Sequence, residues 1–138
     1  LREHLLDLII LLMVNDKSDA VSPEESSIKA AHRERAIAHI QYRHSDPQLT
    51  PKSIAAACGI SVGYLHKIFH AADLRVEHLL YEQRLQTCRS MLLSAAHRGQ
   101  SVQQIAFKSG FNHPSHFSRL FKQRYGMSPS EFRATQAE

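Results

Sequence analysis

The chain has 138 residues, of which 43% are hydrophobic and 22% charged. That size and composition predict one compact folded domain and exclude a large multidomain enzyme and a disordered tail. The formal net charge is +4, but residues 1–27 carry two basic and six acidic side chains, whereas residues 28–138 carry 15 basic and seven acidic ones. Clustered Lys and Arg release counterions from phosphates, so the basic part indicates nucleic acid or an anionic membrane as partner, unless its charge serves only solubility.

Residues 1–13 place Leu and Ile at helical spacing, which predicts an amphipathic helix with a wide apolar face. The run is too short to cross a bilayer, which takes about 20 residues, and no signal-peptide cleavage site follows. We therefore expect no membrane partner and a cytoplasmic location. Because the chain begins with Leu, we expect residues 1–27 to be the last helix of a truncated regulatory or dimerisation domain plus a polar linker. A helix that docks on this same domain is the alternative.

A second helix is expected over residues 28–44, ended by Ser45-Asp46-Pro47. Its predicted inward residues are Ala30, Ala31, Ile37, Ala38 and Ile40, and its predicted outward residues are Lys29, Arg33, Arg35 and Arg43.

The pattern of a helix-turn-helix follows. Thr50 is placed to cap a short helix that begins at Pro51. A turn containing Gly59 comes next, and Ser61 is placed to cap a second helix over residues 62–72. The inward residues of this second helix are Leu65, Ile68 and Phe69.

The same pattern occurs a second time. Ile54-Ala55 and Gly59-Ile60 recur 51 residues later as Ile105-Ala106 and Gly110-Phe111. One residue is then inserted in the turn, so the inward residues of the second helix recur 52 residues later, as Phe117, Leu120 and Phe121. Ser101 is placed to cap a helix over 102–109, and a second helix should run from Asn112 or His113 to about Tyr125. A helix over residues 76–95, roughly 30 Å long, joins the two motifs and so comes close to the spacing of about 34 Å between successive major grooves.

The expected fold class is therefore all-α: two helix-turn-helix subdomains joined by a long linker helix, about seven helices, plus the extra N-terminal helix. The DNA-binding domain should comprise residues 28–138, with the first motif at about 50–72 and the second at about 101–125.

The cysteines indicate no covalent chemistry. Cys58 and Cys88 stand 30 positions apart and form no CxxC pair, which fits a reducing cytoplasm and indicates neither a disulfide framework nor a zinc site. No Gly-rich phosphate loop and no paired carboxylates occur, and a nucleophilic Cys58 is the least favoured alternative. We expect no cofactor and no enzyme activity.

The histidines give a weak metal pattern. His66 and His70 have the i, i+4 spacing of metal ligands on a helix, but Lys67 stands where an HExxH motif has its carboxylate. His113 and His116 lack a third ligand at suitable spacing. We expect no metal site.

Residues 33–135 resemble the AraC/XylS family of bacterial transcription regulators. The most specific stretch is Ile105 to Arg133, IAFKSGFNHPSHFSRLFKQRYGMSPSEFR, and the first motif, IAAACGISVGYLHKIFHAADLRVEHLLYEQRL, is similar more loosely. The resemblance implies a seven-helix domain that inserts its third and sixth helices into successive major grooves and recruits RNA polymerase. It also implies an N-terminal domain, here cut away, that senses a small-molecule effector and forms a homodimer.

Carried over to this sequence, the resemblance implies base-reading residues at Gly63, His66, Lys67, Pro114, Ser115, His116, Ser118 and Arg119. Candidate phosphate contacts, which lie at helix starts or on the same outward faces, are Thr50, Ser61, Tyr64, His70, Ser101, His113, Lys122, Gln123 and Arg124. The chain departs from the family pattern at Leu74, where Gly is usual, and at Val76, where Ser or Thr usually caps the linker helix; another turn geometry is expected there.

We expect sequence-specific binding of double-stranded DNA by a transcriptional regulator, with activation as the expected outcome. The alternative is a regulatory module that contacts RNA polymerase or another protein, with incidental affinity for DNA.

Overall fold

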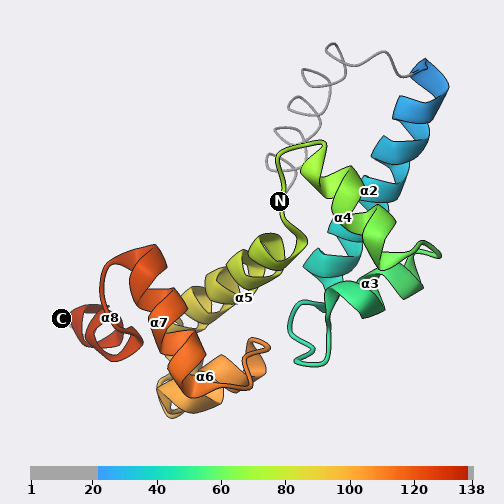
Figure 1. The fold of residues 1–138 in the computed structure, drawn as a ribbon. Helices are drawn as coiled ribbons and strands as arrows, with labels where there is room; N and C mark the ends of the chain where they lie inside the picture. The colour runs from blue at the N-terminus through green and yellow to red at the C-terminus, as the bar shows by residue number, and fades with distance from the viewer. Residues whose placement is uncertain (1–21, 137–138) are drawn as a thin grey trace. The chain divides into compact units, whose positions relative to one another are not determined.

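The computed structural model describes residues 22–136, and within that range every regular element is helical (Figure 1). The elements are α2 (Pro23–Arg43), α3 (Pro51–Ala57), α4 (Val62–His70), α5 (Val76–Leu93), the short 3-10 helix η1 (Ala95–His97), α6 (Val102–Lys108), α7 (Pro114–Tyr125) and α8 (Pro129–Gln136). The predicted all-α class is confirmed. The helix expected over residues 1–13 lies outside the described range. Within that range, no helix has both the length and the apolar character needed to span a membrane.

The contacts divide the chain into two compact units, each holding one helix-turn-helix motif. Unit 1 comprises the residues up to His39 together with Thr50–Leu79, and unit 2 comprises Ile40–Leu49 together with the residues from Leu80 onward. Both α2 and α5 therefore begin in unit 1 and end in unit 2.

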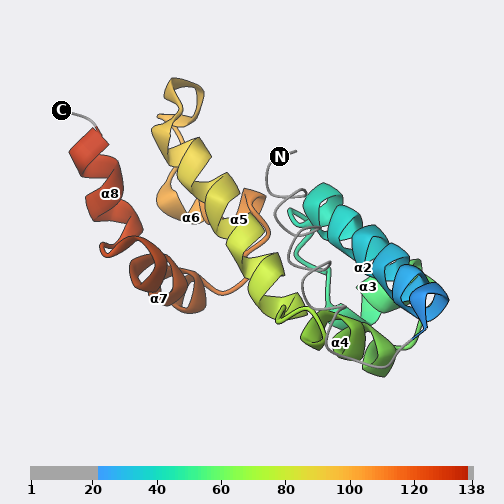
Figure 2. The same cartoon turned by 90° about the horizontal axis from the view of Figure 1, so that it is seen from above.

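In unit 1, α2, α3 and α4 lie side by side (Figure 2). The predicted inward residues of α4, Leu65, Ile68 and Phe69, are buried, as is Ile54 of α3. The predicted caps are confirmed: the Thr50 hydroxyl accepts from the Ser53 N–H at 3.2 Å, and the Ser61 hydroxyl accepts from the Tyr64 N–H at 3.1 Å. These bonds satisfy N–H groups that a helix start leaves unpaired.

The predicted start of the second helix at residue 28 is wrong, because α2 already begins at Pro23. Proline suits the first helical position, Glu24 and Glu25 in the first turn favour the helix dipole, and the Ser22 hydroxyl accepts from the Glu25 N–H at 3.2 Å. Residues 23–27 are therefore helix and not linker.

The predicted faces of α2 also need correction. Arg33, expected to point outward, is only 3% exposed, whereas Ala31 and Ala38, expected inward, are exposed. Arg33 stands four residues before Ile37 and seven before Ile40, both fully buried, and therefore falls on the same apolar stripe of the helix. On α2, the burial of a side chain therefore follows its position around the helix and not its polarity.

The turn between α4 and α5 departs from the family geometry at Leu74 and Val76, as the sequence predicts. The left-handed residue is Asp73, with φ 56°, and not Leu74. Aspartate tolerates this conformation better than most residues, and the turn is closed by a hydrogen bond from the Leu74 N–H to the Phe69 carbonyl at 2.9 Å. Val76 is the first residue of α5, and its side chain is only 1% exposed. Burial of this apolar side chain therefore stabilises the start of α5, at the position where the family pattern has a capping Ser or Thr.

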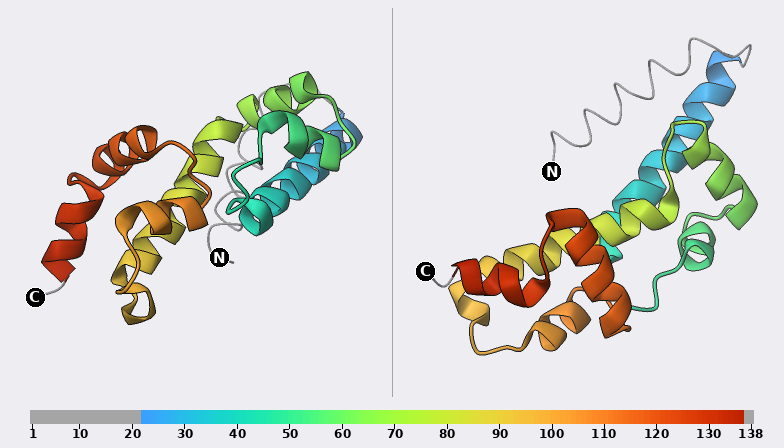
Figure 3. Two further views of the ribbon diagram at one scale, coloured as in Figure 1. Left: turned by 90° about the horizontal axis from the view of Figure 1, so that it is seen from below. Right: turned by 60° about the vertical axis from the view of Figure 1, so that its left-hand side comes forward.

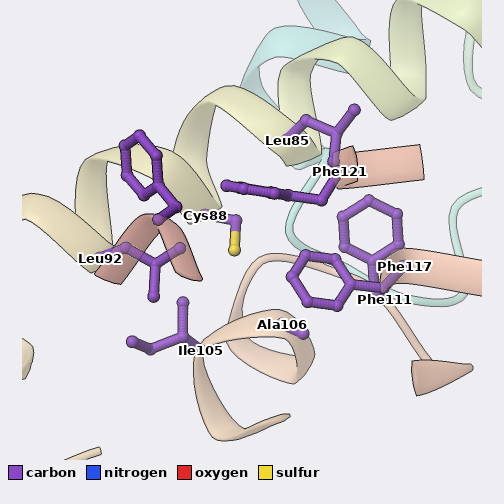
Figure 4. Close-up of a cluster of buried hydrophobic side chains, with 9 residues drawn as sticks. Leu85, Cys88, Leu92, Ile105, Ala106, Phe111, Phe117 and Phe121 are labelled. Atoms are coloured by element: carbon purple, nitrogen blue, oxygen red, sulfur yellow. The ribbon is translucent and has the colours of Figure 1, made fainter. Parts of the chain in front are cut away.

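Unit 2 has an aromatic core that α6, α7 and α8 build against α5 (Figures 3 and 4). Its buried members are Leu85, Cys88, Leu92, Ile105, Ala106, Phe111, Phe117, Phe121 and Phe132. The rings of Phe111 and Phe117 lie 5.1 Å apart between centroids, and those of Phe117 and Phe121 lie 5.8 Å apart. Such tilted pairs add to the free energy gained from burying apolar area. Phe117 and Phe121 thereby fix one face of α7.

A buried arginine holds the segment between α2 and α3 in unit 2. Arg84 of α5 is 5% exposed and donates to three backbone carbonyls, those of His44 at 2.8 Å, Asp46 at 2.9 Å and Leu49 at 3.4 Å. Burial lowers the pKa of Arg84 from its usual value. The ring of His44 adds a second tie, since its Nε2 lies 2.6 Å from the Thr87 hydroxyl.

Candidate nucleic-acid interface

The outward face of α4 carries the side chains that the sequence assigned to base reading. Gly63, His66 and Lys67 are all exposed, while the three apolar residues of α4 are buried in unit 1. Lysine and histidine offer donors to guanine O6 and N7 or to phosphate oxygens, whereas Gly63 offers no side chain. Of these three positions, only His66 and Lys67 therefore have a side chain that can bond to a base.

The outward face of α7 is richer in donors. Pro114, Ser115, Ser118 and Arg119 are exposed, and Phe117 and Phe121 turn into the core. His116 is half-buried, with its ring 5.2 Å from that of Tyr81 in an edge-on contact. Of the five candidates on α7, His116 is thus the one that also packs against α5. Arg119 presents a full guanidinium, the side chain best suited to a bidentate bond with guanine.

The candidate phosphate contacts differ in what they already bond to and in their exposure. The hydroxyls of Thr50, Ser61 and Ser101 each accept a cap hydrogen bond from their own helix, at 3.1 to 3.2 Å, and retain an O–H that can donate to a phosphate. Tyr64 is half-buried, its ring 5.7 Å from that of His32. The remaining candidates are exposed on the surface: His70, His113, Lys122, Gln123 and Arg124.

His113 is the N-cap residue of α7 but does not cap the helix with its side chain. Its backbone is extended and precedes Pro114 at the first helical position, but its side chain makes no capping bond. The imidazole of His113 is therefore not occupied by the helix end and remains a candidate donor to phosphate.

Arg124 is engaged within the protein. Its Nε lies 2.9 and 3.0 Å from the two carboxylate oxygens of Glu82 on α5, and its guanidinium lies 5.0 Å from the centroid of the Tyr125 ring. The hydrogen bond to Glu82 raises the pKa of Arg124 further above its usual value. A phosphate would have to compete with Glu82 for this side chain.

Removing that competitor gives a test of Arg124 as a phosphate contact. We expect Glu82→Gln to tighten binding to specific and random duplexes alike by about two- to fivefold, and to steepen the salt dependence by up to about one released counterion. Glu131→Gln, the same charge change at an exposed position of α8, is the control and should have a smaller effect. Fluorescence anisotropy titrations at several salt concentrations measure both quantities. Equal effects of the two variants would show that Arg124 does not contact phosphate.

The two cysteines lack the surroundings of a nucleophile. Both are buried, burial raises the pKa of Cys58, and burial raises the pKa of Cys88 to about 12. A thiol with a raised pKa stays protonated and unreactive. Among residues 22–136, no three His, Cys, Asp or Glu side chains are grouped so that they could hold a metal ion.

Two buried arginines are not predicted from the sequence. The pattern places Arg33 on the solvent face of its helix and singles out no role for Arg84, whereas both are buried and donate to backbone carbonyls. For Arg33 the signal was available, because it lies on the stripe of Ile37 and Ile40. For Arg84 the signal was weaker: it directly precedes the buried Leu85 on a helix with apolar residues on several sides.

Comparison with known proteins agrees with this geometry. A family model described as a helix-turn-helix domain matches residues 54–135. The transcriptional activator NphR of a Rhodococcus species is 37% identical over 98 residues, which are 71% of this chain and 28% of that protein. The HTH-type transcriptional activator RhaS of Klebsiella pneumoniae is 28% identical over 131 residues, 94% of this chain and 45% of that protein.

A solved structure shows the same fold. The C-terminal domain of AraT, a response regulator from Geobacillus stearothermophilus, superposes with a TM-score of 0.68 at 27% identity, covering 85% of this chain and 88% of that one. The chain spans less than half the length of the two curated relatives. With the family match over both motifs, these likenesses show that the chain belongs to the AraC/XylS family of transcriptional regulators and carries its helix-turn-helix DNA-binding domain.

Proposed function

We propose that this domain binds double-stranded DNA sequence-specifically, with α4 and α7 entering successive major grooves, and that the protein activates transcription. The observation that carries the proposal is the matched pair of exposed cations, Lys67 on α4 and Arg119 on α7, which occupy the same place in the two motifs 52 residues apart. Each stands on a helix whose opposite face is committed to a core. Two such helices provide base contacts, and the basic residues around them provide phosphate contacts.

The activating role is supported by the relatives, since NphR and RhaS are both named as transcriptional activators. In this proposal RNA polymerase is a partner, and a domain outside this chain binds the effector and forms the homodimer. The location is the cytoplasm, where the DNA of a bacterium lies.

Selection of bound sequences from a random duplex library tests the binding. We expect a site with two conserved blocks about 10 base pairs apart, bound at sub-micromolar concentration and not displaced by random duplex. The affinity should fall steeply with salt, because several phosphates release counterions together. Recovery of no common sequence, or of a single block, would overturn the two-groove proposal.

One pair of variants on α7 separates base reading from phosphate contact. We expect Arg119→Ala to relax the choice of base at one position, with a loss of about 1–3 kcal/mol for the selected site and little for random duplex. Lys122→Ala should weaken both duplexes similarly, because a phosphate contact carries no sequence information. Competition titrations with single-base variants of the site measure the difference. Equal losses on specific and random DNA for Arg119→Ala would contradict its assignment.

One observation favours a protein partner as a second function. Phe107 on α6 is 62% exposed next to the buried Ile105 and Ala106, so its ring is accessible to an apolar surface of a partner. If contact with RNA polymerase or another protein were the main task of the domain, random duplex would displace the selected site in a mobility-shift titration, and binding to the protein partner would not depend on DNA.

A further inference from the structure

In the last turn of α4, the carbonyl of Ile68 accepts a hydrogen bond from a side chain of another helix. The N–H of Ala71 bonds to the Lys67 carbonyl, those of Ala72 and Leu74 both bond to the Phe69 carbonyl, and that of Asp73 bonds to the His70 carbonyl. These bonds end on carbonyls other than that of Ile68. Ends of helices leave such acceptors, and a buried one costs free energy unless another group donates to it.

Arg33 of α2 supplies the donor. Its Nη1 donates to the Ile68 carbonyl across 35 residues of sequence, and its side chain is only 3% exposed. A cation at the C-terminal end of a helix is also favoured by the helix dipole, and a bond from a charged donor is stronger than one between neutral groups.

The position of this bond matters because of what surrounds it on α4. Lys67 directly precedes Ile68, His66 stands two residues before it, and both are exposed. Leu65, Ile68 and Phe69 attach α4 to the core by apolar contacts, which tolerate small rotations and shifts. The bond from Arg33 is directional and comes from another helix, so it limits how far α4 can turn about its axis.

We propose that Arg33 is a positioning residue for DNA recognition: from α2 it holds the last turn of α4, so that His66 and Lys67 point at their bases. This inference rests on the proposed function. The sequence expectation that Arg33 faces solvent, where it could have contacted DNA directly, is replaced by an indirect role in which Arg33 touches no base.

The test uses the 138-residue chain with Arg33→Met, which keeps the length of the side chain and removes its donors. Arg33→Lys, which retains the charge, covers the case that the first variant folds poorly. The control is Arg35→Met, the same change at an exposed position of the same helix. Amide hydrogen exchange without DNA is measured first. For Arg33→Met we expect exchange in α4 to rise about tenfold relative to α7, for Arg33→Lys a smaller rise, and for Arg35→Met none.

The second readout is binding to three duplexes: the selected site, the site with the block read by α4 scrambled, and the site with the block read by α7 scrambled. Arg33→Met should lose most of its discrimination at the α4 block, by about tenfold or more, and keep its discrimination at the α7 block. Arg33→Lys should recover part of the loss, and Arg35→Met should keep both. A merely structural role would reduce the fraction of active protein without changing one block selectively.

The outcomes separate the two proposals. Equal losses at both blocks, unchanged discrimination, or a uniform rise in exchange would overturn the role of Arg33. If the wild-type chain discriminates neither block, the proposed function fails, and the exchange measurement alone decides whether Arg33 holds α4.

Discussion

Replacing Gly110 with Ala should lower the free energy of unfolding by about 3 kcal/mol or more, because two costs fall on one position. The backbone of Gly110 has φ +108°, which a residue with a Cβ adopts only under strain. A Cβ there would also lie 2.5 Å from the His44 carbonyl oxygen and 2.6 Å from Nε of Arg84. The carbonyl is backbone and already accepts from Arg84, so neither neighbour can move without breaking a hydrogen bond.

The repeated motif supplies the control for this variant. Gly59 occupies the equivalent turn of the first motif with φ +70°, but a Cβ on Gly59 would meet nothing within 4 Å. Gly59→Ala should therefore cost only the backbone strain, about 1–2 kcal/mol. Urea unfolding followed by circular dichroism measures both losses. If the two substitutions cost the same, the close packing of Arg84 and His44 on Gly110 is not rigid.

Replacing Arg84 with Met should cost about 2–4 kcal/mol. The methionine fills much of the space but cannot donate, so the carbonyls of His44, Asp46 and Leu49 lose the guanidinium that now binds them. In the folded variant, a buried carbonyl without a partner lacks the hydrogen bonds to water that it makes in the unfolded state, and this lowers the stability. The loss should appear as a lower urea midpoint with little change in the slope of the transition.

The matched control is Arg89→Met on the same helix. Arg89 is exposed and lies over the rings of Tyr125 and Phe132, 5.7 Å from each centroid. Such surface contacts are worth about 0.5–1 kcal/mol, so this variant should be much closer to the wild type. A similar cost for both variants would mean that the charge of α5, and not the bonds of Arg84, stabilises unit 2.

Much of the fold could be predicted because its local signals are strong. Thr50, Ser61 and Ser101 are placed as caps, and the structure shows each of them accepting the expected bond. The repeated apolar pattern also located the buried faces of α4 and α7, because the residues at helical spacing on these faces are all apolar. The start of α2 was missed although Pro23 and Glu24 form a common helix beginning, because neighbouring serines and acids resemble a linker.

What sequence reasoning could not supply is the use of long-range partners. Arg33 and Arg84 bond to carbonyls 35 or more residues away. The sequence around each arginine does not indicate which carbonyl accepts its hydrogen bond. The same holds for Arg124, whose partner Glu82 stands 42 residues earlier. The departure from the family pattern at Leu74 predicts another turn geometry, but it does not indicate that the left-handed residue is Asp73. The base-reading assignments remain predictions for the variants above.

The membership of residues 40–49 in unit 2 affects how the protein can be shortened. The family match covers residues 54–135 and invites truncation just ahead of α3. Such a product would lack the three acceptors of Arg84 and would leave the guanidinium beside Gly110 without them. We expect it to be poorly soluble, and a useful expression boundary lies upstream of Pro23, even for work on the second motif alone.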